Sequence, residues 1–310
     1  MKKAKGLCLF LAAVALFTVL PVAAADRDPV RRYLILGCDE AAGLTDAILL
    51  VARNSESGEV RILQIPRDTA AVYSGGKSRK INGAFRSLGG RELAAFFSRA
   101  LGVKIHRYAA IDLPCLALLV DQVGGVDLEV PIPMDYSDPE QGLEIHLPAG
   151  RQHLNGAAAQ SFVRFRSGYA NADLGRMDAQ KVFLRAFAEK LETLDSGALL
   201  RLFFAAAPHT KTDLPVQEAV ALANGLRGAD LSGAPMERAP GEAVKSADGA
   251  WFFVVSREGL RTAVNRLLMP QIPVSDGAFD PDRVFDRPAE GAFHRIYSSP
   301  AEGGKKGYTE

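Results

Sequence analysis

The stretch Arg61-Ile-Leu-Gln-Ile-Pro-Arg-Asp-Thr69 contains a short strand that stops abruptly and is followed at once by polar side chains. Its residues alternate as far as Pro66, which has no N–H to donate and therefore ends the strand. Arg67, Asp68 and Thr69 then lie at the carboxyl end of an apolar strand, where open α/β sheets hold their ligands. A guanidinium there offers a rigid fork of donors that suits phosphate or carboxylate oxygens. The alternative interpretation is a solvated turn with a local pair between Arg67 and Asp68.

The composition indicates a folded protein with a nearly neutral body. The chain has 310 residues, which suffices for one large α/β domain or two modest ones. Lys and Arg number 37 against 36 for Asp and Glu, and without Lys2, Lys3 and Lys5 the balance becomes 34 against 36. A general nucleic-acid binder needs a basic face, so this balance argues against that class. The arginines therefore matter by their positions and not by their number.

Residues 1–25 are typical of a secretory signal peptide or of an N-terminal membrane anchor. Three lysines precede an apolar run from Leu7 to Leu20, and Ala23-Ala24-Ala25 offers an Ala-x-Ala cleavage site. The uncleaved alternative stays open, because residues 7–25 are just long enough to span a bilayer of ~30 Å. Both interpretations place the body of the protein outside the cytoplasm.

Cysteine usage does not decide the redox state. Cys8 lies in the N-terminal segment, which leaves Cys38 and Cys115 in the body. These two could pair in an oxidising compartment or could both be buried thiols. Their spacing forms no metal-ligand motif.

Strand and helix patterns alternate along the body of the chain. Apolar or alternating runs predict strands at residues 33–37, 47–52, 61–65, 108–111, 126–130, 143–147 and 250–255. Helical spacing predicts helices at residues 91–101, 113–123, 155–166, 173–194, 197–207, 216–226 and 257–268. This order predicts an α/β sheet covered by helices, and the polar residues 270–310 predict a loose tail. The helix at 113–123 has almost no polar face, so it must be buried or line an apolar cavity.

Charged and amide side chains stand at the ends of several predicted elements. They are Asp39, Asp46, Arg67, Asp68, Arg164, Arg166, Asp173, Arg176 and Gln180. Taken alone, Arg164 and Arg166 could simply serve the last carbonyls of their helix. Taken together, the arginines can neutralise a pyrophosphate while Asp39 and Asp46 hold a Mg²⁺ ion that bridges its oxygens.

The order of the motifs resembles a known family. The chain contains, in sequence, Leu36-Gly37-x-Asp39, Thr45-Asp46, Ile65-Pro66-Arg67-Asp68-Thr69, Lys80-Ile81-Asn82-Gly83-Ala84-Phe85, Leu119-Val120-Asp121-x-Val123-Gly124-Gly125-Val126-Asp127, Pro148-Ala149-Gly150-x-Gln152-x-Leu154-Asn155-Gly156, Val163-Arg164-x-Arg166 and Asp173-x-Gly175-Arg176. This ordered set resembles the LytR–CpsA–Psr family of bacterial cell-envelope proteins. The likeness is strong over residues 32–194 and weaker to about 269, so we expect one catalytic domain over residues 31–269.

The resemblance implies a mixed central sheet covered by helices on both faces, with an apolar pocket for a polyprenyl chain. It also implies a phosphotransferase that moves a glycopolymer from a polyprenyl (pyro)phosphate carrier onto peptidoglycan during cell-wall biogenesis. Such an enzyme would act at the extracytoplasmic face of the cytoplasmic membrane, anchored or secreted. The helix at 113–123, with Phe162 and Phe183, would help to line the lipid pocket, or would pack as ordinary core.

The resemblance further implies roles for particular side chains. The expected substrate-binding set is Arg67, Lys80, Arg164, Arg166, Arg176 and Gln180. Three of these arginines, Arg67, Arg164 and Arg166, are also expected to be catalytic, because guanidiniums can stabilise developing phosphate charge. Asp68 is expected to orient Arg67 or, alternatively, to take the proton of the acceptor. Asp39 and Asp46 are the expected ligands of Mg²⁺.

The chain departs from the family pattern at two places. Leu44-Thr45-Asp46-Ala47 stands where the family usually has Arg-Ser-Asp-Thr, and Ala179-Gln180-Lys181 stands where it has Arg-Gln-Gln. Lys181 could restore a charge but not a planar fork. These departures keep two alternatives open: a hydrolase of polyprenyl pyrophosphate, and a non-catalytic polyprenyl-phosphate binder that regulates envelope assembly.

Overall fold

The structure is a computed structural model that describes residues 28–39, 43–73, 79–139, 143–169, 173–226, 229–246, 249–275, 277–280 and 293–295. The expected signal peptide or anchor at residues 1–25 lies outside the described residues, as does most of the expected tail after residue 280. Within the described part, no helix is both long enough and apolar enough to cross a membrane.

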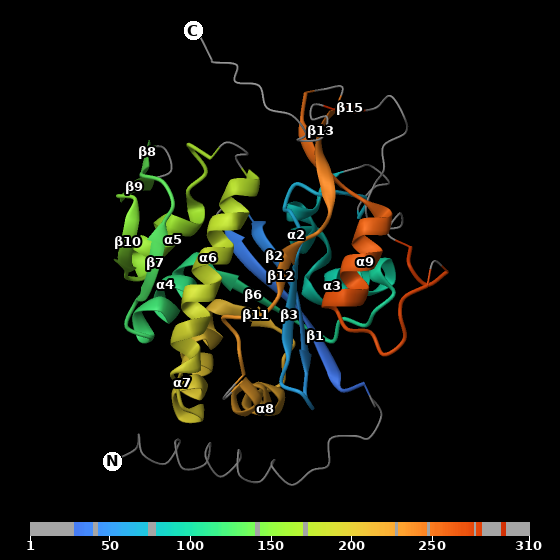
Figure 1. Cartoon of the computed structure of the whole chain (residues 1–310), viewed down its shortest axis with the longest axis horizontal. Coiled ribbons are helices and arrows are strands. Elements are labelled where there is room, and N and C mark those ends of the chain that lie inside the picture. The colour runs from blue at the N-terminus through green and yellow to red at the C-terminus, as the bar shows by residue number, and fades with distance from the viewer. Residues whose placement is uncertain are drawn as a thin grey trace.

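A six-stranded mixed sheet forms the centre of the fold (Figure 1). Its strands, in spatial order, are β11 (Thr210–Thr212), β6 (Arg107–Asp112), β1 (Val30–Asp39), β2 (Leu44–Asn54), β3 (Val60–Gln64) and β12 (Met236–Arg238). The β1–β6 and β3–β12 pairs are parallel, and the other pairs are antiparallel. The four strands predicted first along the chain are confirmed as β1, β2, β3 and β6, whereas the three-residue edge strands β11 and β12 were not predicted.

An irregularity in the β1–β2 hairpin positions one acidic side chain. Gly37 pairs with Ala47 but Cys38 pairs with Thr45, so Asp46 is an extra residue on β2. Such a bulge bends its strand and redirects a side chain. The hairpin is tight here, since a Cβ built on Gly37 would lie only 3.2 Å from Ala47 Cβ.

Helices lie on both sides of the central sheet (Figure 1). On one side are α2 (Ala84–Leu88), which follows the 3-10 turn η2 (Ile81–Gly83), α3 (Gly90–Leu101) and α9 (Arg257–Leu267). On the other side are α4 (Leu113–Gln122), α5 (Gly156–Arg164) and α6 (Asp173–Glu192). The helices α2, α3 and α9 pack into a core cluster that contains Leu50 and Leu63 of the sheet. The helices α4, α5 and α6 pack into a second cluster that contains Phe162 of α5. The expected fold class, a mixed sheet covered by helices, is confirmed.

Small sheets surround this centre. They are β4 (Ala70–Ala71) with β5 (Arg79–Lys80), β7 (Val126–Val130) with β10 (Gly150–Leu154), β8 (Met134–Asp138) with β9 (Leu143–Leu147), and β13 (Gly241–Ser246) with β14 (Trp251–Val255) and β15 (Phe293–Arg295). The predicted strands at 126–130, 143–147 and 250–255 belong to these sheets and not to the central one.

The expected helices are all present, and α4, α5, α7 (Ser196–Ala206) and α9 each begin after a residue whose side chain caps the first turn. The Asn155 side chain accepts a hydrogen bond from Ala158 N (2.9 Å), as its place before α5 predicts. The apolar helix α4 is only partly covered, because Cys115 and Val120 are buried while Leu116 and Leu119 are half-buried. Cys38 and Cys115 are free thiols.

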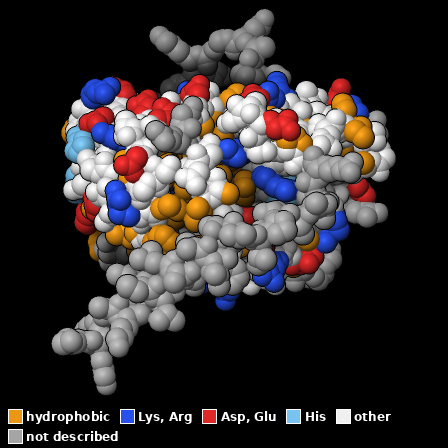
Figure 2. Space-filling model, turned by 90° about the horizontal axis from the view of Figure 1, so that it is seen from below, with side chains coloured by type: hydrophobic (Ala, Val, Ile, Leu, Met, Phe, Trp, Pro, Cys, Tyr) orange, Lys and Arg blue, Asp and Glu red, His pale blue; other side chains and the backbone are white. Residues whose placement is uncertain are grey.

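Two further helices form the lower end of the molecule in Figure 1. They are α7 (Ser196–Ala206), which continues into η3 (Ala207–His209), and α8 (Val216–Leu226). Phe204 and Val216 on these helices are 48% and 49% exposed. Figure 2 views the molecule from below and shows apolar side chains gathered left of the centre of this face.

A buried arginine joins the first strand to the last helix. Arg32 on β1 is 2% exposed and donates from Nε to Leu268 O (2.6 Å) and from Nη2 to Met269 O (2.8 Å). Its Nη1 lies 2.8 Å from Asp28 Oδ2. The packed body therefore includes α9. Beyond it, Val274 and Phe279 are also buried in the core, so the loose tail that the sequence predicts for residues 270–310 is wrong for residues 270–275 and 277–280, because apolar side chains there pack against the body. For the residues outside the described ranges it stays a prediction.

Arg32→Ala is expected to lower the free energy of unfolding by about 2–4 kcal/mol, because two carbonyls and Asp28 lose a buried charged donor. Chemical denaturation measures the change. Arg99→Ala is the matched control, since it removes only an exposed pair with Glu92 and should change the free energy by less than ~1 kcal/mol. Equal effects of the two substitutions would contradict the structural role of Arg32.

Candidate functional site

The turn after β3 has the form that the sequence predicts. Ile65 is buried and its N–H donates to Ile48 O (2.9 Å), and Pro66 then ends the ladder. Thr69 donates to Pro66 O from its backbone N (3.0 Å) and from Oγ1 (2.6 Å), which closes the turn. Arg67 and Asp68 are thereby held at the end of the sheet where β2 begins.

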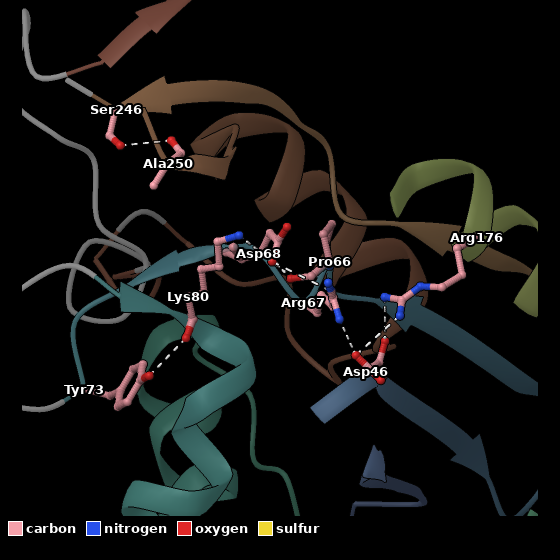
Figure 3. Close-up of polar contacts among 10 residues, drawn as sticks. Asp46, Pro66, Arg67, Asp68, Tyr73, Lys80, Arg176, Ser246 and Ala250 are labelled. Carbon is pink, nitrogen blue, oxygen red and sulfur yellow. Dashed lines mark hydrogen bonds and ion pairs between the residues drawn. The ribbon is translucent and has the colours of Figure 1, made fainter. Parts of the chain in front are cut away.

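Asp46 lies between two guanidiniums at this end of the sheet (Figure 3). Arg67 Nη1 donates to Asp46 Oδ1, and Arg176 Nη1 on α6 lies 3.4 Å from the same oxygen. Arg176 Nη2 also donates to the backbone O of Asp46 (3.2 Å). The Arg176 residue is only 1% exposed, whereas the side chains of Arg67 and Asp46 are 14% and 30% exposed. Three separate segments therefore meet at one carboxylate.

The electrostatic balance at Asp46 favours its ionised form. Burial raises the pKa of Asp46, but the charges and hydrogen bonds of Arg176 and Arg67 together lower it by more. The pKa therefore lies below the ordinary value of 3.8. At neutral pH, Asp46 is an anion that fixes both arginines and neutralises only part of their charge.

A second carboxylate, that of Asp68, lies beside Lys80 (Figure 3). Lys80 Nζ is 3.1 Å from Asp68 Oδ1, and Arg67 Nε is 3.8 Å from the same oxygen. The backbone of this region is fixed as well, because Tyr73 Oη donates to Lys80 O (3.0 Å) and Ile81 N donates to Thr69 O (2.8 Å). The geometry agrees with an orienting role for Asp68 toward Arg67, and the role itself stays a prediction.

Gln180 links this cluster to the end of α5. It lies one helical turn after Arg176 on α6, is 7% exposed, and donates from Nε2 to Val163 O (3.3 Å). Gln64 at the end of β3 donates to Gln180 Oε1 (3.5 Å) and is itself 3% exposed. Gln64 was not among the predicted site residues. The sequence feature that could have identified Gln64 is a polar side chain near the end of an apolar strand, two residues before the Pro66 that ends this strand.

Arg164 and Arg166 follow Val163 in sequence but form no hydrogen bond or ion pair with the described members of this network. Arg164 follows Val163 and is half-buried, and Arg166 is exposed. Neither guanidinium has a hydrogen bond or ion pair with another residue that the structure describes. Their predicted roles in binding and catalysis stay predictions.

The two expected metal ligands lie in the same hairpin. Asp39 ends β1 and pairs with Leu44, and its backbone O accepts a hydrogen bond from Gly43 N (2.8 Å). Asp46 lies on β2, two residues after Leu44. Among the described residues there is no group of three or more His, Cys, Asp or Glu side chains that could hold a metal ion. Carboxylate oxygens are nevertheless ligands that Mg²⁺ accepts, one or two at a time, together with substrate phosphates.

The expected apolar lipid pocket stays a prediction. Phe162 and Phe183 are 0% and 4% exposed and belong to the core cluster around α4, α5 and α6. A cavity of about 560 Å³ lies among Arg53, Glu59, Asn224 and Pro235, at the opposite end of β2 from Asp46. Its lining is mainly polar, so it is not the predicted apolar pocket.

Comparison with known proteins gives a consistent set of matches. The sequence model of the LytR_cpsA_psr family matches residues 22–268. The chain is 28% identical over 199 residues to the polyisoprenyl-teichoic acid–peptidoglycan teichoic acid transferase TagV of Bacillus subtilis, covering 61% of this chain and 51% of TagV. The chain thus spans about half the length of that relative. It is 30% identical over 243 residues to the transferase TagU of Bacillus cereus, covering 76% of each protein.

The crystal structure of Bacillus subtilis TagV has the same fold. It superposes with a TM-score of 0.68 at 23% sequence identity and covers 79% of this chain and 98% of that structure.

Asp46→Asn is expected to lower the free energy of unfolding at pH 7 by about 1–3 kcal/mol, because the amide loses the charge that faces two guanidiniums. The folded pKa of Asp46 lies below 3.8, so the stability that its ionised form contributes is complete above pH 3.8 and is lost as the pH falls through the folded pKa. Urea unfolding between pH 7 and the lowest pH at which the protein stays folded measures this.

The difference between Asp46→Asn and the unsubstituted protein should therefore shrink toward acid pH. Asp178→Asn is the control, since its side chain is 78% exposed and lies 4.0 Å from Arg238; it should show no such trend. A constant difference across the pH range for Asp46→Asn would contradict the assigned ion pairs.

Proposed function

The chain belongs to the LytR–CpsA–Psr family, and we propose that it transfers a glycopolymer from a polyprenyl (pyro)phosphate carrier to peptidoglycan. The relatives TagV and TagU are named as transferases that join teichoic acid to peptidoglycan. A teichoic-acid-like polymer is accordingly the first substrate to test. The family and the fold support this proposal, and the clustered arginines supply the chemistry.

The observation that carries the proposal is the meeting of Arg67, Arg176 and Lys80 with the carboxylates of Asp46 and Asp68 at one end of the sheet. Arg67 Nη1 donates to Asp46, and the Arg67 side chain is 14% exposed, so part of its guanidinium is accessible to a substrate. Arg176, which the resemblance assigns to substrate binding, is buried against Asp46 and would instead hold that carboxylate in place. Arg164, one residue after the carbonyl that Gln180 binds, would approach the same phosphates from α5.

In the proposed reaction, a hydroxyl oxygen of peptidoglycan attacks the phosphorus that carries the glycopolymer. A new P–O bond forms, and the P–O bond to the polyprenyl phosphate breaks with its electron pair remaining on the departing oxygen. The hydroxyl gives its proton to solvent. Negative charge increases on the phosphate oxygens in the transition state, and fixed donors from Arg67 and its neighbours stabilise it without reorganising.

A Mg²⁺ ion is part of the proposal. Asp39 and Asp46 offer oxygen ligands within one hairpin, which suits an ion that also takes oxygens from a diphosphate. When bound, the ion would neutralise phosphate charge as a Lewis acid. Asp46 would then serve the ion and the two arginines together.

The place of action is also proposed. Residues 1–25 have the pattern of a signal peptide or anchor, which supports action at the extracytoplasmic side of the cytoplasmic membrane. A polyprenyl carrier resides in that membrane. The half-buried leucines of α4 are candidates to contact its chain.

The departures from the family pattern keep a non-catalytic binder as a second candidate. Ala179, which stands where the family has an arginine, is 3% exposed in the core cluster around α6. The chain thus has no guanidinium at that position. Lipid that copurifies with the protein, without turnover under any condition, would favour this candidate. Release of polyprenyl phosphate without an acceptor would favour the hydrolase.

Arg67→Ala is expected to lower kcat/KM for glycopolymer transfer at least ~100-fold, since it removes a fixed donor to the developing charge. Its effect on stability should be small compared with core substitutions, because Arg67 is partly exposed. A polyprenyl-diphosphate-linked sugar and peptidoglycan fragments provide the assay. Arg91→Ala, whose side chain is 83% exposed, is the matched control. Unchanged transfer by Arg67→Ala would refute the assigned role.

Removal of divalent ions is expected to abolish transfer and addition of Mg²⁺ to restore it. Titration calorimetry with Mg²⁺ and a polyprenyl diphosphate gives a readout independent of turnover. Asp39→Asn should weaken Mg²⁺ binding roughly tenfold or more, whereas Asp138→Asn on the separate β8–β9 sheet should leave it unchanged. Equal Mg²⁺ affinity in both variants would exclude Asp39 as a ligand.

A further inference from the structure

The β13–β14 hairpin is attached to the loop that carries Asp68. Phe253 N on β14 donates to Asp68 O (2.9 Å), and Thr69 forms a parallel bridge with Phe253. Figure 3 shows the Ser246–Ala250 pair on this hairpin, with Asp68 and Lys80 below it. The hairpin thus borders the candidate site through backbone contacts, and its position is tied to that of Asp68.

Trp251 is the first residue of β14 and is exposed, whereas Phe253 and Val255 further along the strand are buried. It is 40% exposed and is the single tryptophan of the chain. Successive strand residues point to opposite faces, so Trp251 shares a face with Phe253, which is 4% exposed and packs in the core. Lys245 is opposite Trp251 in the register and is also exposed. An exposed indole and an exposed ammonium therefore stand together on the face that carries Phe253, while the backbone of Asp68 and Thr69 lies along the edge of β14.

We propose that Trp251 and Lys245 form the platform that binds the sugar rings of the acceptor glycan, and this inference rests on the proposed transfer function. An indole ring offers a large, rigid surface whose negative face attracts the C–H bonds on the apolar side of a pyranose ring. The hydroxyl groups of the sugar stay in water. Lys245 adds a cation that can pair with acidic groups of the glycan strand. The platform would present an acceptor hydroxyl toward the phosphates held by Arg67.

A membrane is the competing partner for an exposed tryptophan, because Trp is enriched at membrane interfaces. The position of the hairpin argues against it. Phe253 on β14 is hydrogen-bonded through its backbone to Asp68, so the hairpin stands beside the candidate site. Continuity with the candidate site therefore favours the glycan.

The test uses a β-1,4-linked tetramer of N-acetylglucosamine as the probe and the purified full chain. Because the chain has one tryptophan, its fluorescence reports Trp251 alone. The emission is expected to shift to shorter wavelength and to saturate as the tetramer is added. Titration calorimetry should show binding weakened about tenfold or more by Trp251→Ala and less by Trp251→Phe. Tyr136→Ala is the matched control, since Tyr136 is 37% exposed on the separate β8–β9 sheet.

In the transfer assay, Trp251→Ala should raise KM for the acceptor and leave KM for the donor unchanged. Equal tetramer affinity of Trp251→Ala and the unsubstituted protein would overturn the platform, as would an emission shift with phosphatidylglycerol vesicles but not with the tetramer. If Trp251→Ala transfers the glycopolymer with an unchanged KM for the acceptor, the platform is overturned but the proposed transfer function is not. Tetramer binding at Trp251 in a protein without transfer would support the platform and refute the proposed function.

Discussion

The ion pairs of Asp46 with Arg67 and Arg176 are the constraint on which the site depends. A nearly fully buried guanidinium such as Arg176 is unfavourable unless an anion and hydrogen-bond acceptors meet it. Asp46 supplies both, through its carboxylate and its backbone carbonyl. The bulge makes Asp46 an extra residue in β2, and the contacts of Asp46 fix α6 and the loop after β3 to the same point.

The surrounding contacts extend this constraint outward. Gln180 connects α6 to the last turn of α5, and the β13–β14 hairpin is bonded to Asp68. Each connection uses a backbone group, so displacement of one segment would disturb the others. The result is a cluster in which Arg67, Arg176 and Lys80 meet the carboxylates of Asp46 and Asp68 and the segments that carry them are held in place. Such a preorganised cluster is what transfer of a phosphate-linked polymer requires.

The strand before Pro66 and the polar residues Arg67 and Asp68 after it could be predicted from the sequence, because they depend on local chemistry. The family could be predicted because it depends on the order of the motifs. The sequence did not predict that Asp46 would pair with Arg67 and Arg176, since this pairing follows from a bulge in the strand register, which a single strand pattern does not contain. Gln64 was missed because its partner, Gln180, is distant in sequence. The edge strands β11 and β12 have three residues each, too few to show a period. Contacts for Arg164 and Arg166, and the Mg²⁺ ion, depend on a substrate and so remain predictions.

The most direct test of this account is a crystal structure of the protein with a short polyprenyl diphosphate and Mg²⁺. The account predicts that the phosphates bind beside Arg67, with Arg176 still on Asp46 and with the isoprenoid chain running along α4. Phosphates bound away from Arg67, for example in the polar cavity beside Arg53, would contradict it.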